Sequence, residues 1–126
     1  MTSSTPASAV LRRAALVALG GMLGTAARMG LGLLIPDAPV GVLVANLVGA
    51  LVLGILTARL PASDLRVFLG TGMLGGFTTY SSFMVDSVQL WASSALLAAG
   101  YVALTLAGGI ALAALGLHLG RKRGAA

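Results

Sequence analysis

One stretch decides the fold: Gly70-Thr71-Gly72-Met73-Leu74-Gly75-Gly76-Phe77-Thr78-Thr79-Tyr80-Ser81-Ser82-Phe83. It is part of an apolar segment, yet it has four glycines within seven residues and then five consecutive hydroxyl side chains. A glycine inside a helix costs about 1 kcal/mol relative to alanine, and backbone groups freed within a membrane must be satisfied by protein or by a hydrated cavity. The stretch therefore predicts a transmembrane helix broken near Gly75–Thr79. The alternative is a packing notch, with glycines for close helix approach and hydroxyls bonded to the preceding turn.

The composition around this stretch is that of a membrane protein. Of 126 residues, 58% are hydrophobic and 9% are charged, and the mean hydropathy is +1.02. A water-soluble domain of this length could not keep so much apolar surface from water. The absence of cysteine excludes disulfides and thiolate metal sites. The net charge of +5 comes mostly from basic residues at segment ends, so we expect lipid headgroups, and not nucleic acid, as the partner.

Four apolar spans are expected to form one transmembrane domain over residues 10–120. At about 1.5 Å per residue, each span is long enough to cross a hydrocarbon core of about 30 Å. Prolines break the chain between the first two spans and again after the second. The expected spans are residues 10–35, 40–60, 65–91 and 95–119, flanked by a disordered tail at 1–9 and a basic tail at 121–126. Small residues four apart predict close packing faces at Gly20 and Gly24, Ala45 and Gly49, Ala50 and Gly54, and Gly116 and Gly120.

The basic residues predict an orientation. With four spans, both termini and the loop between the second and third spans share one side of the membrane. Arg28 alone lies nearer the other side. The shared side carries Arg12, Arg13, Arg59, Arg66, Arg121, Lys122 and Arg123. Because basic residues are retained in the cytoplasm, the termini are predicted to be cytoplasmic unless the chain inserts both ways.

Polar residues within the spans are the candidates for function. Asn46 lies in the middle of the second span, where its amide needs a partner, so it is either a link between helices or a ligand. Tyr101 and Thr105, with Gly109, form a polar stripe on the fourth span, which ordinary packing explains equally well. Asp86 is the one carboxylate inside a span, and it either reaches the membrane surface or forms a proton or ion site.

Two further charged or titratable residues need an interpretation. Arg28 is either a buried structural cation or an anchor at the membrane surface. His118 adjoins the basic tail and is expected to have no role. No cluster of His, Cys and carboxylates, no Ser/His/Asp set and no phosphate-binding loop is present, so the sequence does not predict an enzyme.

The remaining polar groups suit a pathway for a small ion or molecule. Hydroxyl and amide hydrogens and the edges of Phe rings suit an anion, whereas bare carbonyls at a helix break suit a cation. Both kinds of group occur in the third span. Because four thin helices enclose little space, a pathway is most easily formed between copies of the chain.

Three separated motifs resemble those of the small bacterial fluoride channels of the Fluc or CrcB family. Their order and spacing, and the four-span length, agree over essentially the whole chain. The motifs are Gly20-Gly21-Met22-Leu23-Gly24 with Arg28, Val44-Ala45-Asn46-Leu47-Val48-Gly49 with Gly54, and Gly75-Gly76-Phe77-Thr78-Thr79-Tyr80-Ser81-Ser82-Phe83.

The resemblance implies an antiparallel dimer in the cell (inner) membrane, with two pores that export fluoride passively and one central structural sodium ion. The sodium would be held by the backbone carbonyls of Gly75 and Thr78 from each chain. Arg28 would be structural, and Asp86 falls where the family commonly has a glutamate. The implied pore residues are Asn46, Thr79, Tyr80, Ser81, Ser82, Phe83, Tyr101 and Thr105.

The chain departs from the family pattern in three respects. Tyr80 stands where phenylalanine is usual, and Val42 and Gly109 stand where some members carry hydroxyls. Homodimeric members also carry little charge bias, because they insert both ways. The strong bias here predicts a heterodimer with an oppositely oriented paralogue, with a homodimer as the competing case.

Two other functions fit a four-span chain of this size. A proton-coupled exporter of the small multidrug class needs a carboxylate in the first span, where this chain has Arg28 and no acid. A non-transporting assembly subunit would use its glycine faces for packing alone.

Overall fold

The computed structural model describes residues 6–124, with side chains described through residue 122, and this part of the chain contains helices and no strand. Three helices are each long and apolar enough to cross a membrane: α1 (Ala7–Leu34), α2 (Ala38–Arg59) and α6 (Ala95–Gly124). The remaining crossing is divided into α3 (Asp64–Arg66), the π-helix η1 (Val67–Leu74), α4 (Gly75–Phe77) and α5 (Tyr80–Ser93). The predicted all-helical membrane fold with a broken third crossing is confirmed.

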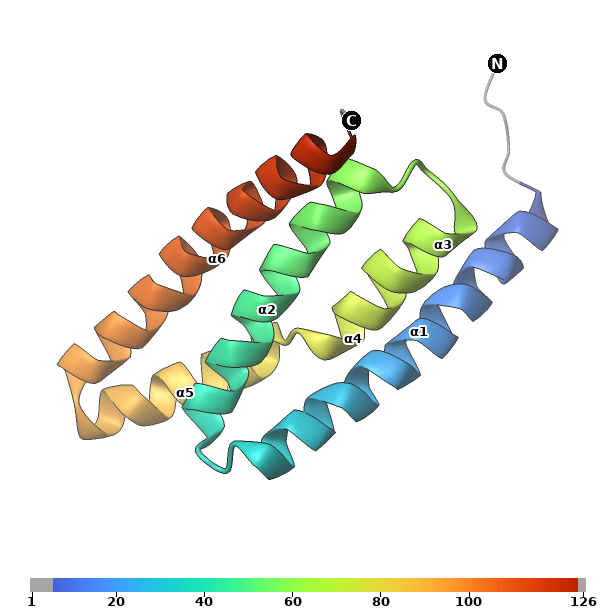
Figure 1. The fold of residues 1–126 in the computed structure, drawn as a ribbon. Coiled ribbons are helices and arrows are strands. Elements are labelled where there is room, and N and C mark those ends of the chain that lie inside the picture. Colours follow the sequence, from blue (N-terminus) through green and yellow to red (C-terminus); the bar gives the residue numbers. More distant parts are fainter. Residues whose placement is uncertain (1–5, 125–126) are drawn as a thin grey trace, which may run out of the picture.

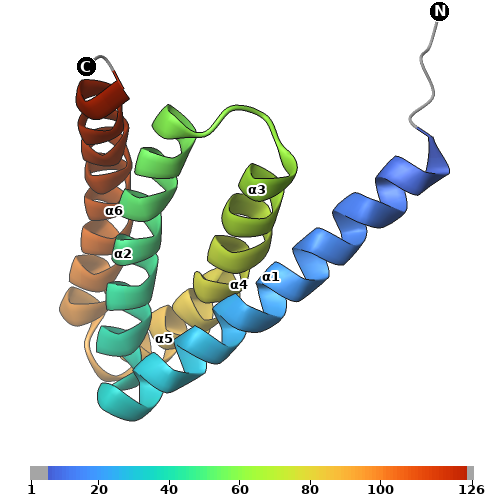
Figure 2. The same ribbon diagram turned by 45° about the vertical axis from the view of Figure 1, so that its right-hand side comes forward.

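The helices form two neighbouring groups (Figures 1 and 2). In one group α2 lies beside α6, and in the other α1 lies against the η1–α4 segment. Both ends of the described chain lie at the same end of the molecule as the loop between α2 and α3, and α1 leans away from α6 toward its own N-terminus (Figure 2). This arrangement is the one that an even number of crossings requires.

Glycines bring α2 and α6 into backbone contact. A Cβ added at Gly54 would lie 2.9 Å from Leu117 N, and one added at Gly116 would lie 3.0 Å from Ile55 N. Only glycine fits at such positions, since real Cβ atoms do not come this close to backbone. In lipid, close approach of this kind replaces the hydrophobic effect as the source of helix association.

Glycines also join α1 to η1 and α4. A Cβ at Gly20 would lie 2.8 Å from Met73 N, and one at Gly24 would lie 2.9 Å from Phe77 N. On the other side of the contact, a Cβ at Gly72 would lie 3.1 Å from the Cα of Gly20. The small residues at four-residue spacing therefore mark real contacts on both helix pairs.

The first and last helices extend into the segments predicted to be tails. The first helix begins at Ala7 and not at residue 10, because the Pro6 carbonyl already accepts bonds from the N–H groups of Ala9 (3.0 Å) and Val10 (3.2 Å). The last helix continues to Gly124 through the segment predicted to be a basic tail. Arginine and lysine are good helix formers, and their charge is favourable at a helix C-terminus. Residues 1–5 and 125–126 lie outside the described part.

The single chain leaves much apolar surface uncovered. The exposed fraction is 85% for Leu33 and 84% for Leu96, and no large side chain among the described residues is fully buried. A fold this thin is stable only where another apolar medium or another chain covers it.

Candidate functional site at the interrupted helix

The interruption lies at Thr78 and Thr79. Both residues have extended backbone, with φ/ψ of −84°/159° and −149°/124°, between the end of α4 and the start of α5. The break near Gly75–Thr79 that the sequence predicts is therefore present. The π-helix that precedes it was not predicted, since no local pattern distinguishes it from an α-helix, although such turns often occur at functional sites.

Asn46 holds the break from α2. Its Oδ1 accepts a hydrogen bond from the Thr79 N–H (2.8 Å), and its Nδ2 donates to the Thr79 carbonyl (3.0 Å). In a continuous α-helix the Thr79 N–H would donate to the carbonyl of Gly75, four residues earlier. Asn46 takes this donor and leaves the Gly75 oxygen without its helical partner. Of the two roles that the sequence left open, the link between helices is present.

A second pair of side chains reaches the break from α1. Thr25 Oγ1 and Arg28 Nε both donate to the Gly76 carbonyl, over 3.4 and 3.3 Å. Arg28 thus places its positive charge at the end of α4, where the helix dipole favours it. Sequence reasoning missed Thr25, although its place three residues before Arg28 puts both side chains on one helix face.

Two carbonyls at the break are left over. Within residues 6–122, no side chain and no backbone N–H donates to the oxygen of Gly75 or Thr78. Gly75 is exposed, and a Cβ built on it would meet nothing within 4 Å. The described residues hold no group of three His, Cys, Asp or Glu side chains that could bind a metal. A cation at this place would therefore be held by backbone oxygens, a donor set that suits sodium.

The hydroxyls of the two threonines have local partners. Thr78 Oγ1 donates to the Leu74 carbonyl (2.9 Å), the bond to the preceding turn that the packing-notch alternative expects. Thr79 Oγ1 caps α5 by accepting from the Ser82 N–H (3.2 Å) and lies 3.3 Å from Ser81 Oγ. Thr79 therefore stabilises the restart of the helix and begins a row of hydroxyls.

A groove on the surface of the chain lies between α2 and the interrupted crossing, runs along η1 and over the break, and includes Thr105 and Leu106 of α6. Gly70 and Thr71 also line the groove. Neither was predicted to be a site residue, although both lie in the stretch that decides the fold. Ser81, Ser82 and Tyr101 do not line it. Seven of the residues predicted for the site line the groove: Asn46, Gly75, Thr78, Thr79, Tyr80, Phe83 and Thr105.

Three aromatic rings form a row beside the break. The ring centroids of Tyr80 and Phe83 are 6.1 Å apart, and those of Phe83 and Tyr101 are 5.4 Å apart. Tyr80 is 75% exposed, whereas Phe83 is buried, with 5% exposed. Tyr101 on α6 therefore backs the Phe83 ring, while Tyr80 continues the row to the surface.

Behind this row lies a buried polar cluster. Tyr101 Oη donates to Asp86 Oδ2 (3.4 Å), and Thr105 Oγ1 donates to the Tyr101 carbonyl (2.7 Å). Asp86 is 7% exposed, so the alternative in which it reaches the membrane surface is wrong, because it faces α6. The predicted stripe on the fourth span is used mainly for contacts within the chain. His118 is exposed on α6.

Comparison with known proteins identifies relatives of this chain. A family model described as "CrcB-like protein, Camphor Resistance (CrcB)" matches residues 15–117. A Paracoccus denitrificans protein named "Fluoride-specific ion channel FluC" is 44% identical over 113 residues, covering 83% of this chain and 91% of the relative. An Agrobacterium fabrum protein of the same name is 45% identical (86% and 95% covered), and a Leifsonia xyli protein named FluC 2 is 42% identical (97% and 95% covered).

Proposed function

Because this chain belongs to the CrcB-like family, we propose that it is a fluoride-selective channel through which fluoride leaves the cytoplasm passively. The observation that supports this most directly is the break itself. The Gly76 carbonyl and the Thr79 N–H are bonded by side chains from two other helices, and a groove lined by aromatic and hydroxyl groups runs beside the break. A chain that used its glycines for packing alone would not need this arrangement.

We propose that two chains meet in opposite orientations along this groove. The free carbonyls of Gly75 and Thr78 from each chain would then surround a structural sodium ion. The outward exposure of Gly75 and the open space around it support this assembly. Sodium would neutralise the carbonyl dipoles and add positive potential near the path of an anion.

The fluoride path would follow the groove past the aromatic row. Fluoride is strongly hydrated, so a narrow path must replace its water with close donors. The edges of the Tyr80 and Phe83 rings and the Thr79 hydroxyl supply such donors in the proposed path, which Thr105 lines with its own hydroxyl hydrogen bonded to the Tyr101 carbonyl. Asn46 uses one of its two amide hydrogens for the Thr79 carbonyl, which leaves the other for the ion.

The residues outside the groove of one chain have supporting roles in this proposal. Ser81 is exposed next to Thr79 and extends the hydroxyl row, with Ser82, toward the surface that a partner would cover. Tyr101 fixes the Phe83 ring, and its hydroxyl is fixed in turn by Asp86. This assigns Tyr101 to positioning.

The charge bias supports cytoplasmic termini and a partner of opposite bias. In the structure the first turns of α1, the end of α2, the short helix α3 and the end of α6, which carry the basic residues other than Arg28, lie at the end that both termini share (Figure 1). Numbered names such as FluC 2 among the relatives fit the existence of paralogues. Labelling of tagged termini in intact cells tests this orientation. We expect both termini to be accessible to the label from the cytoplasm only. Equal labelling from both sides would show dual insertion and self-pairing instead.

Fluoride efflux from reconstituted liposomes, followed with a fluoride electrode, tests the function. We expect fluoride to leave down its gradient with no requirement for a proton gradient, while chloride stays inside. Flux that needs a proton gradient would indicate the exporter alternative. Equal passage of chloride would overturn the channel assignment, and so would no passage of either ion by this chain both alone and reconstituted together with its paralogue.

A further inference from the structure

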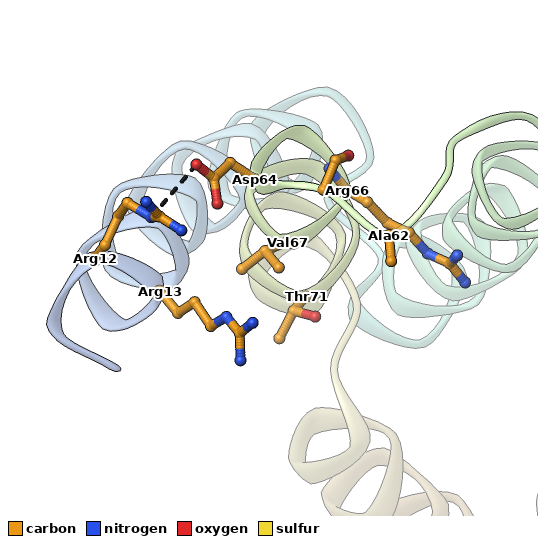
Figure 3. Close-up of a pocket in the computed structure, with 8 residues that line it drawn as sticks. Arg12, Arg13, Ala62, Asp64, Arg66, Val67 and Thr71 are labelled. Atoms are coloured by element: carbon orange, nitrogen blue, oxygen red, sulfur yellow. Dashed lines mark hydrogen bonds and ion pairs between the residues drawn. The ribbon is translucent and has the colours of Figure 1, made fainter. Parts of the chain in front are cut away.

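A cleft at the basic end of the molecule shares only Thr71 with the groove of the proposed channel. It lies between the first turns of α1 and the start of the broken crossing (Figure 3). Closer to the membrane centre, α1 and η1 touch through Gly20 and Gly72. Toward the N-terminus of α1 the glycine contacts end and α1 leans outward, which opens the cleft (Figure 2).

The cleft carries an uncompensated positive charge. Arg12 Nε lies 3.4 Å from Asp64 Oδ2, the one ion pair within residues 6–122. Figure 3 shows Arg13 reaching toward Val67 and Thr71. No carboxylate of the described residues, Asp64 included, lies within ion-pair distance of Arg13. Arg66 extends the opposite way, where Nη1 donates to the Leu60 carbonyl (3.3 Å). The cleft thus offers one free guanidinium beside a hydroxyl and an apolar floor.

Two exposed leucines adjoin the lining residues of the cleft in the sequence. Leu11 precedes the two arginines on α1 and is 70% exposed, and Leu65 lies between Asp64 and Arg66 and is 52% exposed. Side chains of this kind at the same level as a free guanidinium are typical of the boundary between hydrocarbon and headgroups. A free anion in water would gain nothing from these exposed leucines, whereas a phospholipid presents a phosphate directly above acyl chains.

We propose that the cleft binds the phosphate of an anionic phospholipid, with Arg13 and the Thr71 hydroxyl holding the phosphate and the exposed Leu11 and Leu65 contacting the acyl chains. The bound lipid would join α1 to α3 where their backbones have separated. Arg12 is partly neutralised by Asp64, so Asp64 limits the strength of binding. This inference does not depend on fluoride transport.

Lipid retention by the detergent-purified protein tests the site, by native mass spectrometry with dioleoylphosphatidylglycerol, dioleoylphosphatidylcholine or inorganic phosphate as the probe. We expect Arg13→Gln to weaken retention of phosphatidylglycerol by about fivefold, the usual contribution of one basic residue at a membrane surface. Asp64→Asn is expected to change retention in the opposite direction, because it frees Arg12. Arg121→Gln removes the same charge from the same end of the molecule and is expected to change nothing.

Three results would overturn the proposal. An equal loss in Arg121→Gln would show attraction by the general surface charge. Displacement of the lipid by millimolar inorganic phosphate would show a site for a free anion. Equal retention of phosphatidylcholine would show that the anionic headgroup is not recognised. Fluoride efflux by Arg13→Gln in phosphatidylcholine liposomes should match wild type, since Arg13 lies outside the groove, and this verifies folding independently of lipid binding.

Discussion

The two halves of the molecule solve the same packing problem differently. Helices α2 and α6 are continuous, satisfy their own backbone hydrogen bonds and need only glycines at their contact. In the other half, α1 uses glycine contacts of the same kind, but the crossing that it packs against is interrupted. Arg28 and Thr25 of α1 bond the Gly76 carbonyl at the break, and Asn46 of α2 bonds Thr79 from the other half. Interrupting a membrane helix thus requires polar side chains from elsewhere in the chain, and these are the residues that the function needs in place.

The largest expected effect is on the continuous half. Gly116→Leu places a side chain against the backbone of α2, which cannot move aside, so we expect a loss of at least about 3 kcal/mol in the free energy of unfolding and loss of folded protein. Gly100→Leu on the same helix is the control, because a Cβ there meets nothing within 4 Å. Thermal unfolding in detergent measures both. Equal stability of the two variants would show that the backbone contact is dispensable.

The interrupted half responds differently to the same kind of change. Gly75→Leu has room in a single chain, so we expect a folded chain that has lost both dimerisation and fluoride efflux. Size-exclusion chromatography with light scattering, followed by the liposome assay, separates folding from assembly. Gly30→Leu on α1, where a Cβ also meets nothing within 4 Å, is the matched control. A Gly75→Leu dimer that transports would refute the cation site.

Asn46→Ala breaks the connection between the two halves. It leaves the Thr79 N–H without a partner and removes a donor from the Thr79 carbonyl, with an expected loss of about 2 kcal/mol or more. Val48→Ala on the same helix is the control, because Val48 is 45% exposed. If the midpoint of unfolding is the same in both variants, the Asn46 bonds contribute nothing to the break.

Phe83→Ile tests the groove while leaving both halves folded. The change keeps most of the buried volume and removes the ring edge, so we expect fluoride efflux to fall by about tenfold, equivalent to about 1.4 kcal/mol in the barrier. Met84→Ile, at the next position and 40% exposed, should retain the wild-type rate. Wild-type efflux in Phe83→Ile would remove this ring from the proposed path.

The smallest expected effect is at the restart of the helix. Thr79→Ala removes the N-cap of α5 and should lower the free energy of unfolding by about 1 kcal/mol, whereas Thr79→Ser keeps the hydroxyl and most of the stability. Comparison of the two unfolding curves measures the cap alone. A serine variant as unstable as the alanine variant would assign the loss to the threonine methyl group.

Several features of the site follow from neighbouring residues and others do not. The position of the break follows from Gly75 and Gly76 and the hydroxyls after them, because glycine cost and helix capping act within one turn. The bonds that hold the break connect residues 33 and 48 positions apart, from Asn46 to Thr79 and from Arg28 to Gly76. The sequence could identify these side chains as needing partners but could not select the partners.

By itself the sequence determined that this chain spans a membrane with helices, where the crossings lie and which of them is broken, since hydropathy, proline and glycine act locally. Only the tertiary structure decided which carbonyls of the break are bonded and which stay free, that Asp86 is buried against Tyr101, and that Arg13 faces an open cleft while Arg12 is paired. These depend on how helices distant in the sequence lie against one another, a geometry that glycine contacts set over the whole chain and no local pattern encodes.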